Sequence, residues 1–282
     1  MPSHSQAVPP SFLKSTLLPL SLMAYCVGCL ALALYLAQKP SLPGSSEQTF
    51  VPYDALTFNS DSFDTPPLPD FAAIGDIKQK KSAFFNYLLP AIEHNNRRAR
   101  AQHLTVLSWQ TRLRQGLPLD KQTQEGIIKL AKRYKLSTAN RSPMQLTTEL
   151  LVRIDELPSS MVLAQAAIES AWGTSRFARQ ANNLFGQWCF APGCGIVPLQ
   201  RPEGARYEVK KFDHVGAAID AYFLNINGHD AYKPLREIRS KSRLKGEALK
   251  GAALVAGLER YSGRGLSYVH ELRSMIRSNK LE

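Results

Sequence analysis

One glutamate stands out as a candidate acid catalyst. Glu169 is the only acidic residue in the apolar run at 161–172, and it shares one helix face with Val162, Ala166 and Gly173, because these residues are spaced by four, three and four positions. A helix that is apolar almost all round must be largely buried. Burial and a place in the last helical turn both raise the pKa of a carboxyl group. A carboxyl that stays protonated near neutral pH can donate its proton to the leaving oxygen of a glycosidic bond.

An ordinary structural role is the alternative for Glu169. Most helical glutamates extend to solvent or pair with a basic side chain, which here would be Arg176. The apolar surroundings favour the functional interpretation, because strongly perturbed carboxyl groups concentrate at active sites.

Two cysteines lie outside the N-terminal apolar segment that contains Cys26 and Cys29. Cys189 and Cys194 are separated by a Pro-Gly turn, which lets their sulfurs meet. In an oxidising compartment we expect a disulfide, with two free buried thiols as the alternative. We expect no metal site, because two thiolates need two further ligands that no nearby pair of histidines offers. Neither a metalloprotease motif, a serine-hydrolase motif nor a P-loop occurs, so no cofactor is expected.

The elements that must position these residues are mainly helical. Hydrophobic periodicity and capping signals predict helices at about 76–115 (divided in two by Pro90), 123–135, 143–156, 159–173, 214–227, 232–240, 246–260 and 266–278. Residues 184–212 are rich in Gly, Pro and aromatics, and 197–200 and 206–212 predict two strands joined as a hairpin at 202–204. The expected fold class is therefore α+β, mainly α: a lysozyme-like helical domain with a small β-hairpin insertion, preceded by a transmembrane helix and a Pro-rich linker.

The N-terminus predicts a membrane anchor. Residues 17–37 are uncharged, apolar and numerous enough to cross a bilayer as a helix. A cleaved signal peptide, or a lipoprotein signal at Cys29, is the alternative. We expect a single-pass protein of the bacterial inner membrane, with residues 1–16 in the cytoplasm and the catalytic domain in the periplasm. Residues 38–75 hold six prolines and predict a disordered linker.

The charge predicts an anionic partner. The chain has 35 Lys+Arg against 23 Asp+Glu and a formal net charge of +12. Such a surplus suits nucleic acid, a membrane surface or an anionic cell-wall polymer. Nucleic acid is disfavoured as a partner, because a chain anchored outside the cytosol would not meet it.

Two sequence segments resemble a known family. LAQAAIESAWG at 163–173, followed by NNLFG at 182–186, resembles the motif of bacterial glucosaminidase domains, which occur in autolysins and flagellar peptidoglycan hydrolases. The segments at 210–226 and 259–276 have the same family's character. Within this family the chain resembles Bax-type exported proteins, and the resemblance implies a glucosaminidase domain at 141–282 with N-terminal helices at 76–140 packed on it.

The resemblance implies an endo-β-N-acetylglucosaminidase that hydrolyses the β-1,4 bond after N-acetylglucosamine in peptidoglycan or a related glycan. Glu169 matches the family's general acid. The family's second carboxylate lies in the β insertion, where Glu203 and Glu208 are both candidates, and Tyr261 matches a tyrosine close to the catalytic glutamate. A core tyrosine is the alternative for Tyr261, and both an activated water and assistance by the substrate's acetamido group stay open.

Trp188, Phe185 and Asn183 are the candidate substrate-binding residues. Sugar rings stack on aromatic side chains, although most such aromatics belong to the core. Two other functions remain open on this sequence: a lytic transglycosylase that uses the same glutamate, and a non-catalytic module that binds glycan or acts as a scaffold.

Overall fold

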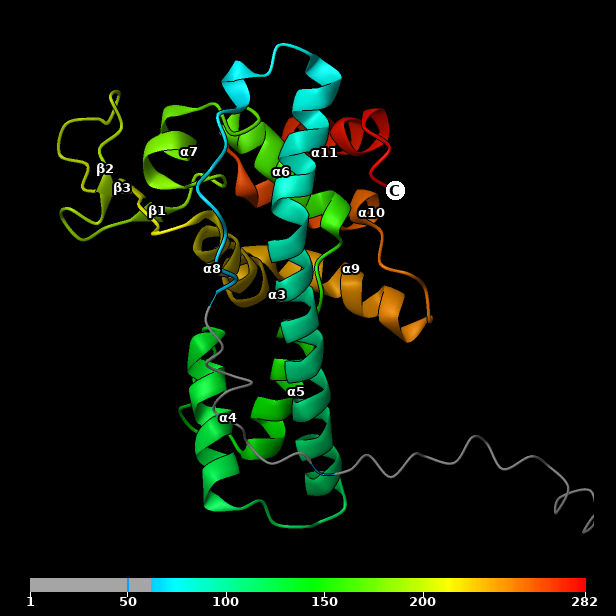
Figure 1. The fold of residues 1–282 in the computed structure, drawn as a ribbon. Helices are drawn as coiled ribbons and strands as arrows, with labels where there is room; N and C mark the ends of the chain where they lie inside the picture. The colour runs from blue at the N-terminus through cyan, green and yellow to red at the C-terminus, as the bar shows by residue number, and fades with distance from the viewer. Residues whose placement is uncertain (1–49, 51–61) are drawn as a thin grey trace, which may run out of the picture. The chain divides into compact units, whose positions relative to one another are not determined.

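Helices dominate the part of the chain that the structure, a computed structural model, describes: Phe50 and residues 62–282. The helical elements are η1 (Phe71–Ala73), α3 (Ile77–Arg114), α4 (Lys121–Arg133), α5 (Pro143–Arg153), α6 (Ser159–Ser170), α7 (Arg176–Ala181), α8 (Val215–Gly228), η2 (Asp230–Tyr232), α9 (Lys233–Leu244), α10 (Gly251–Leu254), η3 (Val255–Tyr261) and α11 (Leu266–Ser278). Three short strands, β1 (Trp188–Cys189), β2 (Gly195–Ile196) and β3 (Glu208–Lys210), form a single sheet. The predicted architecture, mainly helical with a small antiparallel sheet, is confirmed (Figure 1).

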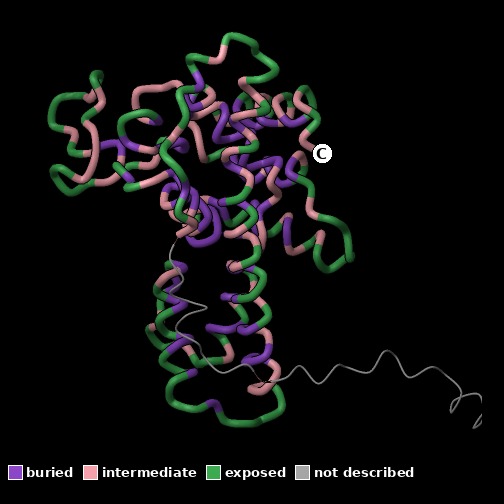
Figure 2. The backbone as a smooth tube through the Cα atoms, viewed as in Figure 1, coloured by how far each residue is buried: buried purple, intermediate pink, exposed green. Residues whose placement is uncertain are grey.

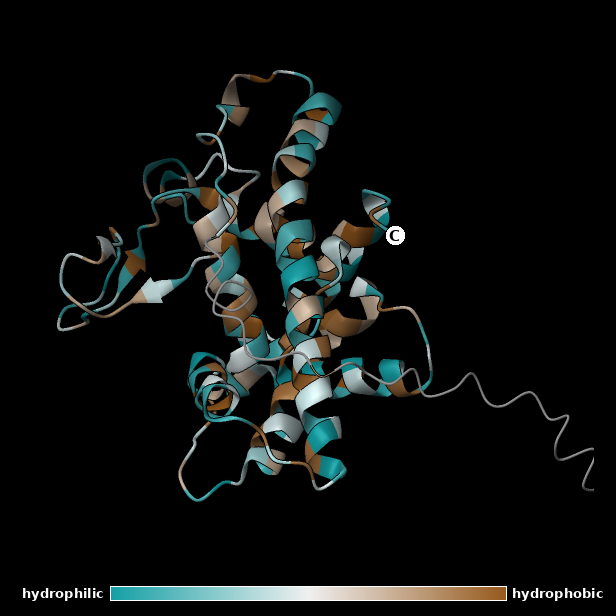
Figure 3. Ribbon diagram, turned by 60° about the horizontal axis from the view of Figure 1, so that its bottom comes forward, coloured by the Kyte–Doolittle hydropathy of each residue, from teal (hydrophilic) through white to brown (hydrophobic). Residues whose placement is uncertain are grey.

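The longest helix, α3, runs through Pro90 without a break. The prediction of two helices divided at this proline is therefore wrong. Proline removes one backbone hydrogen bond and costs about 3 kcal/mol inside a helix. Leu88 and Ile92 on either side of it are fully buried, and each such side chain stabilises the helix by about 1.5–3 kcal/mol. Hydrophilic and hydrophobic residues alternate along α3 (Figure 3). One side of the helix can therefore pack in the core while the other faces solvent.

Two hydrophobic clusters organise the helices. One end of α3 packs with α4 and α5 around Val106, Trp109, Ile127 and Leu150. The other end contributes Leu88 and its neighbours to a larger cluster that includes α6, α8 and α11. The long helix therefore connects the two clusters, and α6 lies in the larger one.

Helix α6 carries Glu169 into the larger cluster. Nine of its residues are buried, and it appears as one of the most continuously buried segments (Figure 2). The helix ends at Ser170 rather than at the predicted Gly173, because Ala171, Trp172 and Gly173 have φ angles of 49°, 59° and 77°. Left-handed residues cannot continue a right-handed helix, and non-glycine residues in this region are uncommon outside strained turns. The Ser170 hydroxyl accepts a hydrogen bond from the Gly173 amide at 2.8 Å and stabilises the turn.

The segment from residue 62 to 75 is ordered, which corrects the predicted extent of the linker. Phe71 is buried against Phe84, and a Cβ on Gly173 would lie 2.7 Å from the Phe71 ring. Thr65 is also buried and accepts a hydrogen bond from the Gly216 amide at 3.2 Å. These side chains anchor the segment at two places: Phe71 packs against the turn that follows α6, and Thr65 bonds to the first turn of α8. The remainder of the predicted linker, apart from Phe50, lies outside the described residues.

The β insertion is a three-stranded sheet and not the predicted hairpin of 197–200 with 206–212. The strand order is β1-β3-β2, with Trp188 opposite Val209 and Ile196 opposite Val209. A Cβ at Gly195 would lie 2.0 Å from the Val209 carbonyl oxygen, so only glycine lets β2 approach β3 this closely. The central strand β3 matches the predicted returning strand, whereas residues 197–200 form no strand.

The predicted membrane anchor at 17–37 lies outside the described residues. Within Phe50 and 62–282, none of the helices combines the length and the apolar character that crossing a bilayer requires.

Candidate active site

Glu169 opens onto a cleft of about 590 Å³ between the end of α6, the loop before β1, and η2–η3. The cleft is lined by Glu169, Phe185, Gly186, Gln187, Trp188, Asn225, His229, Tyr232, Tyr261, Ser262 and Gly263. Its volume is in the range of small-ligand sites. Four of the residues predicted for catalysis or binding, Glu169, Tyr261, Phe185 and Trp188, therefore meet in one cleft.

The carboxyl group of Glu169 is poised to hold a proton. Its Oε1 atom is buried, and within the described part of the chain no hydrogen bond of ordinary geometry reaches it. Burial raises the pKa of Glu169, while the Tyr268 hydroxyl and the Arg264 guanidinium lower it in part and Glu271 adds to the rise. The net shift is upward. Arg176, the alternative partner, donates instead to the Val197 carbonyl at 3.0 Å.

A group of tyrosines surrounds the acid. Tyr261 donates its hydroxyl hydrogen to the Phe185 carbonyl oxygen at 2.8 Å, which ties η3 to the loop before β1. The Tyr261 ring stacks on Tyr268 with centroids 5.8 Å apart and lies 5.8 Å from the Tyr232 ring. Burial raises the pKa of Tyr261 well above its usual value, with further contributions from the neighbouring tyrosines and Glu169. These phenols therefore stay neutral and can only donate or accept hydrogen bonds near Glu169.

Trp188 forms the exposed aromatic wall of the cleft. It is 57% exposed, and one face of its indole stacks on Tyr207 with ring centroids 4.4 Å apart and planes 12° apart. An aromatic side chain held in this way offers a preorganised surface for a sugar ring. Phe185 is buried and stacks on Tyr222 at 4.2 Å, so it forms the floor of the cleft.

Asn183 is buried and shapes the cleft from behind. Its amide nitrogen donates to the carbonyl oxygens of Gln187 and Lys210 at 2.9 and 2.8 Å. Its Oδ1 accepts from the backbone amides of Phe185 and Gln187. All of these partners are backbone groups, so Asn183 fixes the loop that presents Phe185 and Trp188 rather than facing the cleft.

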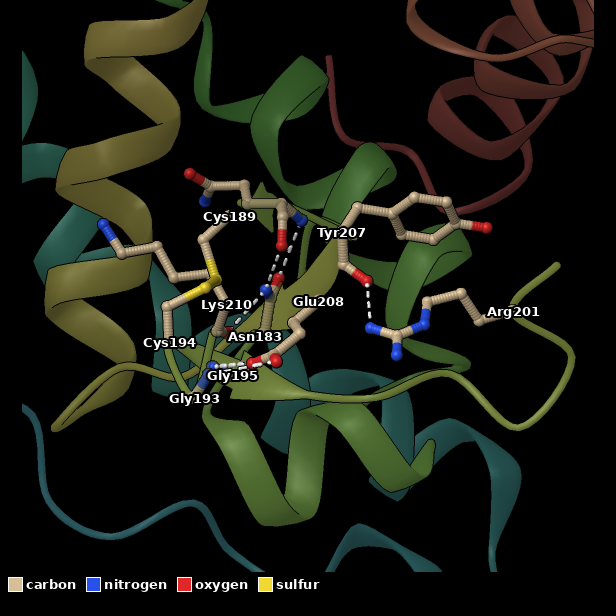
Figure 4. The surroundings of a disulfide bond; sticks show 10 residues. Asn183, Cys189, Gly193, Cys194, Gly195, Arg201, Tyr207, Glu208 and Lys210 are labelled. Carbon is tan, nitrogen blue, oxygen red and sulfur yellow. Dashed lines mark hydrogen bonds between the residues drawn. A yellow bond between two sulfur atoms is a disulfide. The ribbon is translucent and has the colours of Figure 1, made fainter. Parts of the chain in front are cut away.

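The two candidate second carboxylates lie apart from the cleft lining. Glu208 is buried, and its carboxylate accepts hydrogen bonds from the Gly193 and Gly195 amides at 3.0 and 2.8 Å (Figure 4). These two amides hold the pKa of Glu208 below its usual value. Glu203 is exposed on the turn that precedes β3. Glu208 therefore stabilises the disulfide loop, and Glu203 is the acid in this insertion that faces solvent.

The predicted disulfide is present between Cys189 and Cys194, with 6.2 Å between their Cα atoms (Figure 4). The two sulfurs and Glu208 are also close enough together to resemble a metal-binding group. Sulfurs that bond to each other are not available as thiolate ligands, so the disulfide accounts for this cluster. It closes the loop between β1 and β2, next to Trp188.

We expect Cys189→Ser to loosen this loop and to weaken the β insertion more than the helical body. The cross-link restricts the conformations that the loop can adopt when it unfolds. For a short loop, removing it lowers the local unfolding free energy by about 2–3 kcal/mol. Hydrogen exchange should therefore rise at residues 188–196 while α6 keeps its protection. Thiol titration of the folded wild-type protein should find neither Cys189 nor Cys194 free, and two free thiols would contradict the disulfide.

A larger hollow, of about 740 Å³, lies between α3, α5 and α9. Its two acids, Asp155 and Glu156, both bond to Arg243. An acid neutralised by an ion pair is a poor proton donor, so this hollow is the weaker candidate for acid catalysis.

Comparisons with known proteins find a family model, a relative and a solved structure that are similar to this chain. A family model described as mannosyl-glycoprotein endo-beta-N-acetylglucosaminidase matches residues 147–281. Protein bax of Escherichia coli (strain K12) is 31% identical over 223 residues, which cover 79% of this chain and 78% of that protein. The chain belongs to the glucosaminidase family. Among solved structures, the catalytic domain of the autolysin Auto from Listeria monocytogenes is 17% identical, with 75% of this chain and 90% of that chain covered at a TM-score of 0.38.

The glucosaminidase region contains every residue that lines the cleft. The 223 residues aligned with Protein bax are more than this region holds, so the similarity reaches into the helices before residue 147. Family membership and the cleft thus point to the same part of the chain.

Several site residues were not predicted from the sequence. Tyr232, Asn225 and His229 line the cleft, and Gln165 and Tyr268 lie directly behind Glu169. A signal for Gln165 was available, since it is the single amide in the apolar run of α6 and sits one turn before Glu169. Tyr268 had no such signal, because it lies 103 residues away in the sequence from the amide that it contacts.

Proposed function

We propose that this protein hydrolyses β-1,4 glycosidic bonds after N-acetylglucosamine in peptidoglycan, with Glu169 as the general acid. The observation that carries the proposal is the desolvated carboxyl of Glu169 at the base of an open, aromatic-lined cleft in a glucosaminidase-family chain. The raised pKa keeps the group protonated where an ordinary glutamate is ionised. Trp188 offers an exposed apolar surface for a sugar ring that binds beside it, and the buried Phe185 lies in the floor of the cleft.

The chemical step needs a proton and a nucleophile. Glu169 donates its proton to the leaving glycosidic oxygen as the bond to the anomeric carbon breaks. The positive charge that develops on the sugar is then quenched by water or by the substrate's own acetamido oxygen. We assign the activation of water to Glu203, because the Glu208 carboxylate already accepts hydrogen bonds from the Gly193 and Gly195 amides. Glu203 reaches the substrate in this mechanism only when its turn closes over the cleft.

Digestion of purified sacculi by the full chain tests the proposal. Mass spectrometry of the released fragments should show new reducing ends that carry N-acetylglucosamine. Ends that carry 1,6-anhydro-muramic acid would instead identify a lytic transglycosylase, in which the same acid acts and an internal hydroxyl replaces water. Intact sacculi after treatment with folded protein would contradict both enzymatic functions.

We also propose that the protein works from the bacterial inner membrane, anchored by residues 17–37 with the catalytic domain in the periplasm. The disulfide between Cys189 and Cys194 supports export, because such bonds persist in oxidising compartments. Protease added to spheroplasts should then digest the domain, and protection until the membrane is lysed would contradict this topology.

A further inference from the structure

A buried amide lies one helical turn before the candidate acid. Gln165 is fully buried in α6, four residues before Glu169, among apolar neighbours. Burying an amide is unfavourable unless its hydrogen bonds are made. Here both ends are used: the Tyr222 hydroxyl donates to Oε1, and Nε2 donates to the Tyr268 hydroxyl oxygen at 2.9 Å. Both tyrosines are themselves fully buried.

The Gln165 amide fixes the direction of these two hydrogen bonds. A glutamine side chain accepts only through its oxygen and donates only through its nitrogen. Because Tyr222 supplies a proton to Oε1, Nε2 faces Tyr268 and donates to it. The Tyr268 oxygen then receives a hydrogen bond, so its own proton is free to point elsewhere. Glu169 lies one turn further along the same face of α6, and the Tyr268 hydroxyl lowers the pKa of its carboxyl.

We propose that Gln165 is a positioning residue, which holds the Tyr268 hydroxyl with its proton aimed at Glu169. This inference rests on the proposed function, in which Glu169 is the general acid. The three elements that meet here, α6, α8 and α11, are joined by hydrogen bonds that run from Tyr222 through Gln165 to Tyr268, one turn of α6 before the acid. Contacts across such sequence distances serve to lock the acid's orientation.

The positioned hydroxyl has two consequences for Glu169. It restrains the carboxyl in one orientation, and it favours the ionised form, which limits how far burial raises the pKa. The other titratable or charged groups that act on or surround this carboxyl come from each element packed against it: Tyr222 (α8), Tyr232 (η2), Tyr261 (η3), Arg264 in the loop before α11, and Glu271 (α11). Of these groups only Tyr222 bonds to Gln165, and it does so at the end of the amide remote from Tyr268.

The test is the pH dependence of glycan hydrolysis by Gln165→Met. Methionine keeps the length of the side chain but neither accepts nor donates as an amide does, so the Tyr268 proton is no longer directed at the carboxyl. The pKa of Glu169 should then rise, and because the acid must be protonated to act, the alkaline limb should move upward by about one pH unit. At the optimum, kcat should fall about tenfold while KM stays near the wild-type value.

Tyr268→Phe, which removes a single oxygen, should move the alkaline limb in the same direction. Adding Gln165→Met to Tyr268→Phe should then produce no further displacement, because the amide acts through that hydroxyl. An unchanged limb in Gln165→Met, or displacements that simply add, would overturn the proposal. If Gln165→Met does not fold, the alkaline limb of Tyr268→Phe decides. An unchanged limb in that variant would show that the Tyr268 hydroxyl does not act on Glu169, which would overturn the proposal.

A matched control exists in the other core cluster. Gln102 is also fully buried and accepts a hydrogen bond from a tyrosine, Tyr134, at 2.8 Å. Gln102→Met should lower the melting temperature without moving the alkaline limb. A separate readout is the titration of the Glu169 carboxyl by NMR with 13C-labelled glutamate: its pKa should rise in Gln165→Met even if no glycan is cleaved. Absent turnover in the wild type would thus contradict the proposed function, whereas an unmoved NMR titration would contradict the positioning role.

Discussion

Glu169→Gln is expected to reduce the rate of glycan hydrolysis by at least about a thousandfold, within the range that general acids contribute. Glutamine has nearly the shape of a protonated glutamate, so it fills the same space at the end of α6. It cannot release a proton to the leaving oxygen. The measurement is the rate of new reducing ends from purified sacculi at the pH optimum of the wild type.

The same variant should be more stable than the wild type at neutral pH. The pKa of Glu169 is raised in the folded protein above its usual 4.5, so the folded state loses stability as the pH rises through the folded pKa. Glutamine does not titrate and avoids this loss. The difference in unfolding free energy between variant and wild type should therefore be near zero well below pH 4.5 and grow toward neutral pH.

This pair of results separates catalysis from folding. An inactive variant that melts at or above the wild-type temperature has lost its chemistry and not its structure. Glu125→Gln on the exposed face of α4 is a matched control, since its weak ion pair with Lys121 is 3.9 Å long. It should change neither rate nor stability. If glycan turnover survives Glu169→Gln, the protein is a glycan-binding module or uses another acid.

The candidate acid could be predicted from the local sequence, whereas the residues packed around it could not. Glu169 is conspicuous because it is the single acid in a run of apolar residues. A helix that is apolar on nearly every face is expected to be buried, so the burial of this run could be predicted from the sequence. The pairing of Cys189 with Cys194 is equally local, since a turn separates them by five positions. Such features depend on neighbours within one element.

Features that depend on packing between distant elements escaped prediction. The contact of Gln165 with Tyr268 joins residues far apart in the chain, and no local pattern announces it. The same is true of Phe71, which composition assigned to a linker and which packs behind Gly173. The predicted break at Pro90 was wrong for the opposite reason. Proline does destabilise a helix interior, but the burial of the neighbouring residues outweighs that cost.

The three-stranded sheet shows a further limit of local patterns. Its strands are only two or three residues long, so alternation has too few positions to reveal them. The role of Glu208 followed from that sheet, because β3 places its carboxylate against the disulfide loop. A catalytic interpretation of an acid therefore needs the position of its strand as well as its residue type.

Arg239→Met is expected to lower the unfolding free energy by about 3–5 kcal/mol, the usual effect of removing one partner from a buried charged network. Arg239 is 1% exposed, and its two terminal nitrogens donate to the backbone carbonyls of Val152, Arg153, Asp155 and Glu156. Burial lowers its pKa to about 10, so the guanidinium keeps its charge at neutral pH.

The location of these carbonyls explains the size of the expected effect. They lie at the end of α5 and in the connection to α6, where a helix leaves its last carbonyls without intrahelical partners. A positive charge also compensates the negative end of the helix dipole. Methionine would remove the side-chain donor from the Val152, Arg153 and Glu156 carbonyls, while the Asp155 carbonyl keeps a hydrogen bond from the Asn227 amide at 3.0 Å. Each carbonyl left buried and unsatisfied costs about 1–3 kcal/mol.

Arg243 provides the matched control for Arg239, because it lies one turn later on α9 and bonds to the side chains of Asp155 and Glu156. Its side chain is 44% exposed, so water screens these bonds and Arg243→Met should cost about 1 kcal/mol or less. Urea unfolding of both variants measures the difference. Equal losses would contradict the greater importance of the buried carbonyls for the connection between α5 and α6. A larger loss at Arg239 would show that its buried bonds to backbone carbonyls, more than the exposed ion pairs of Arg243, stabilise the connection that leads from α5 into α6.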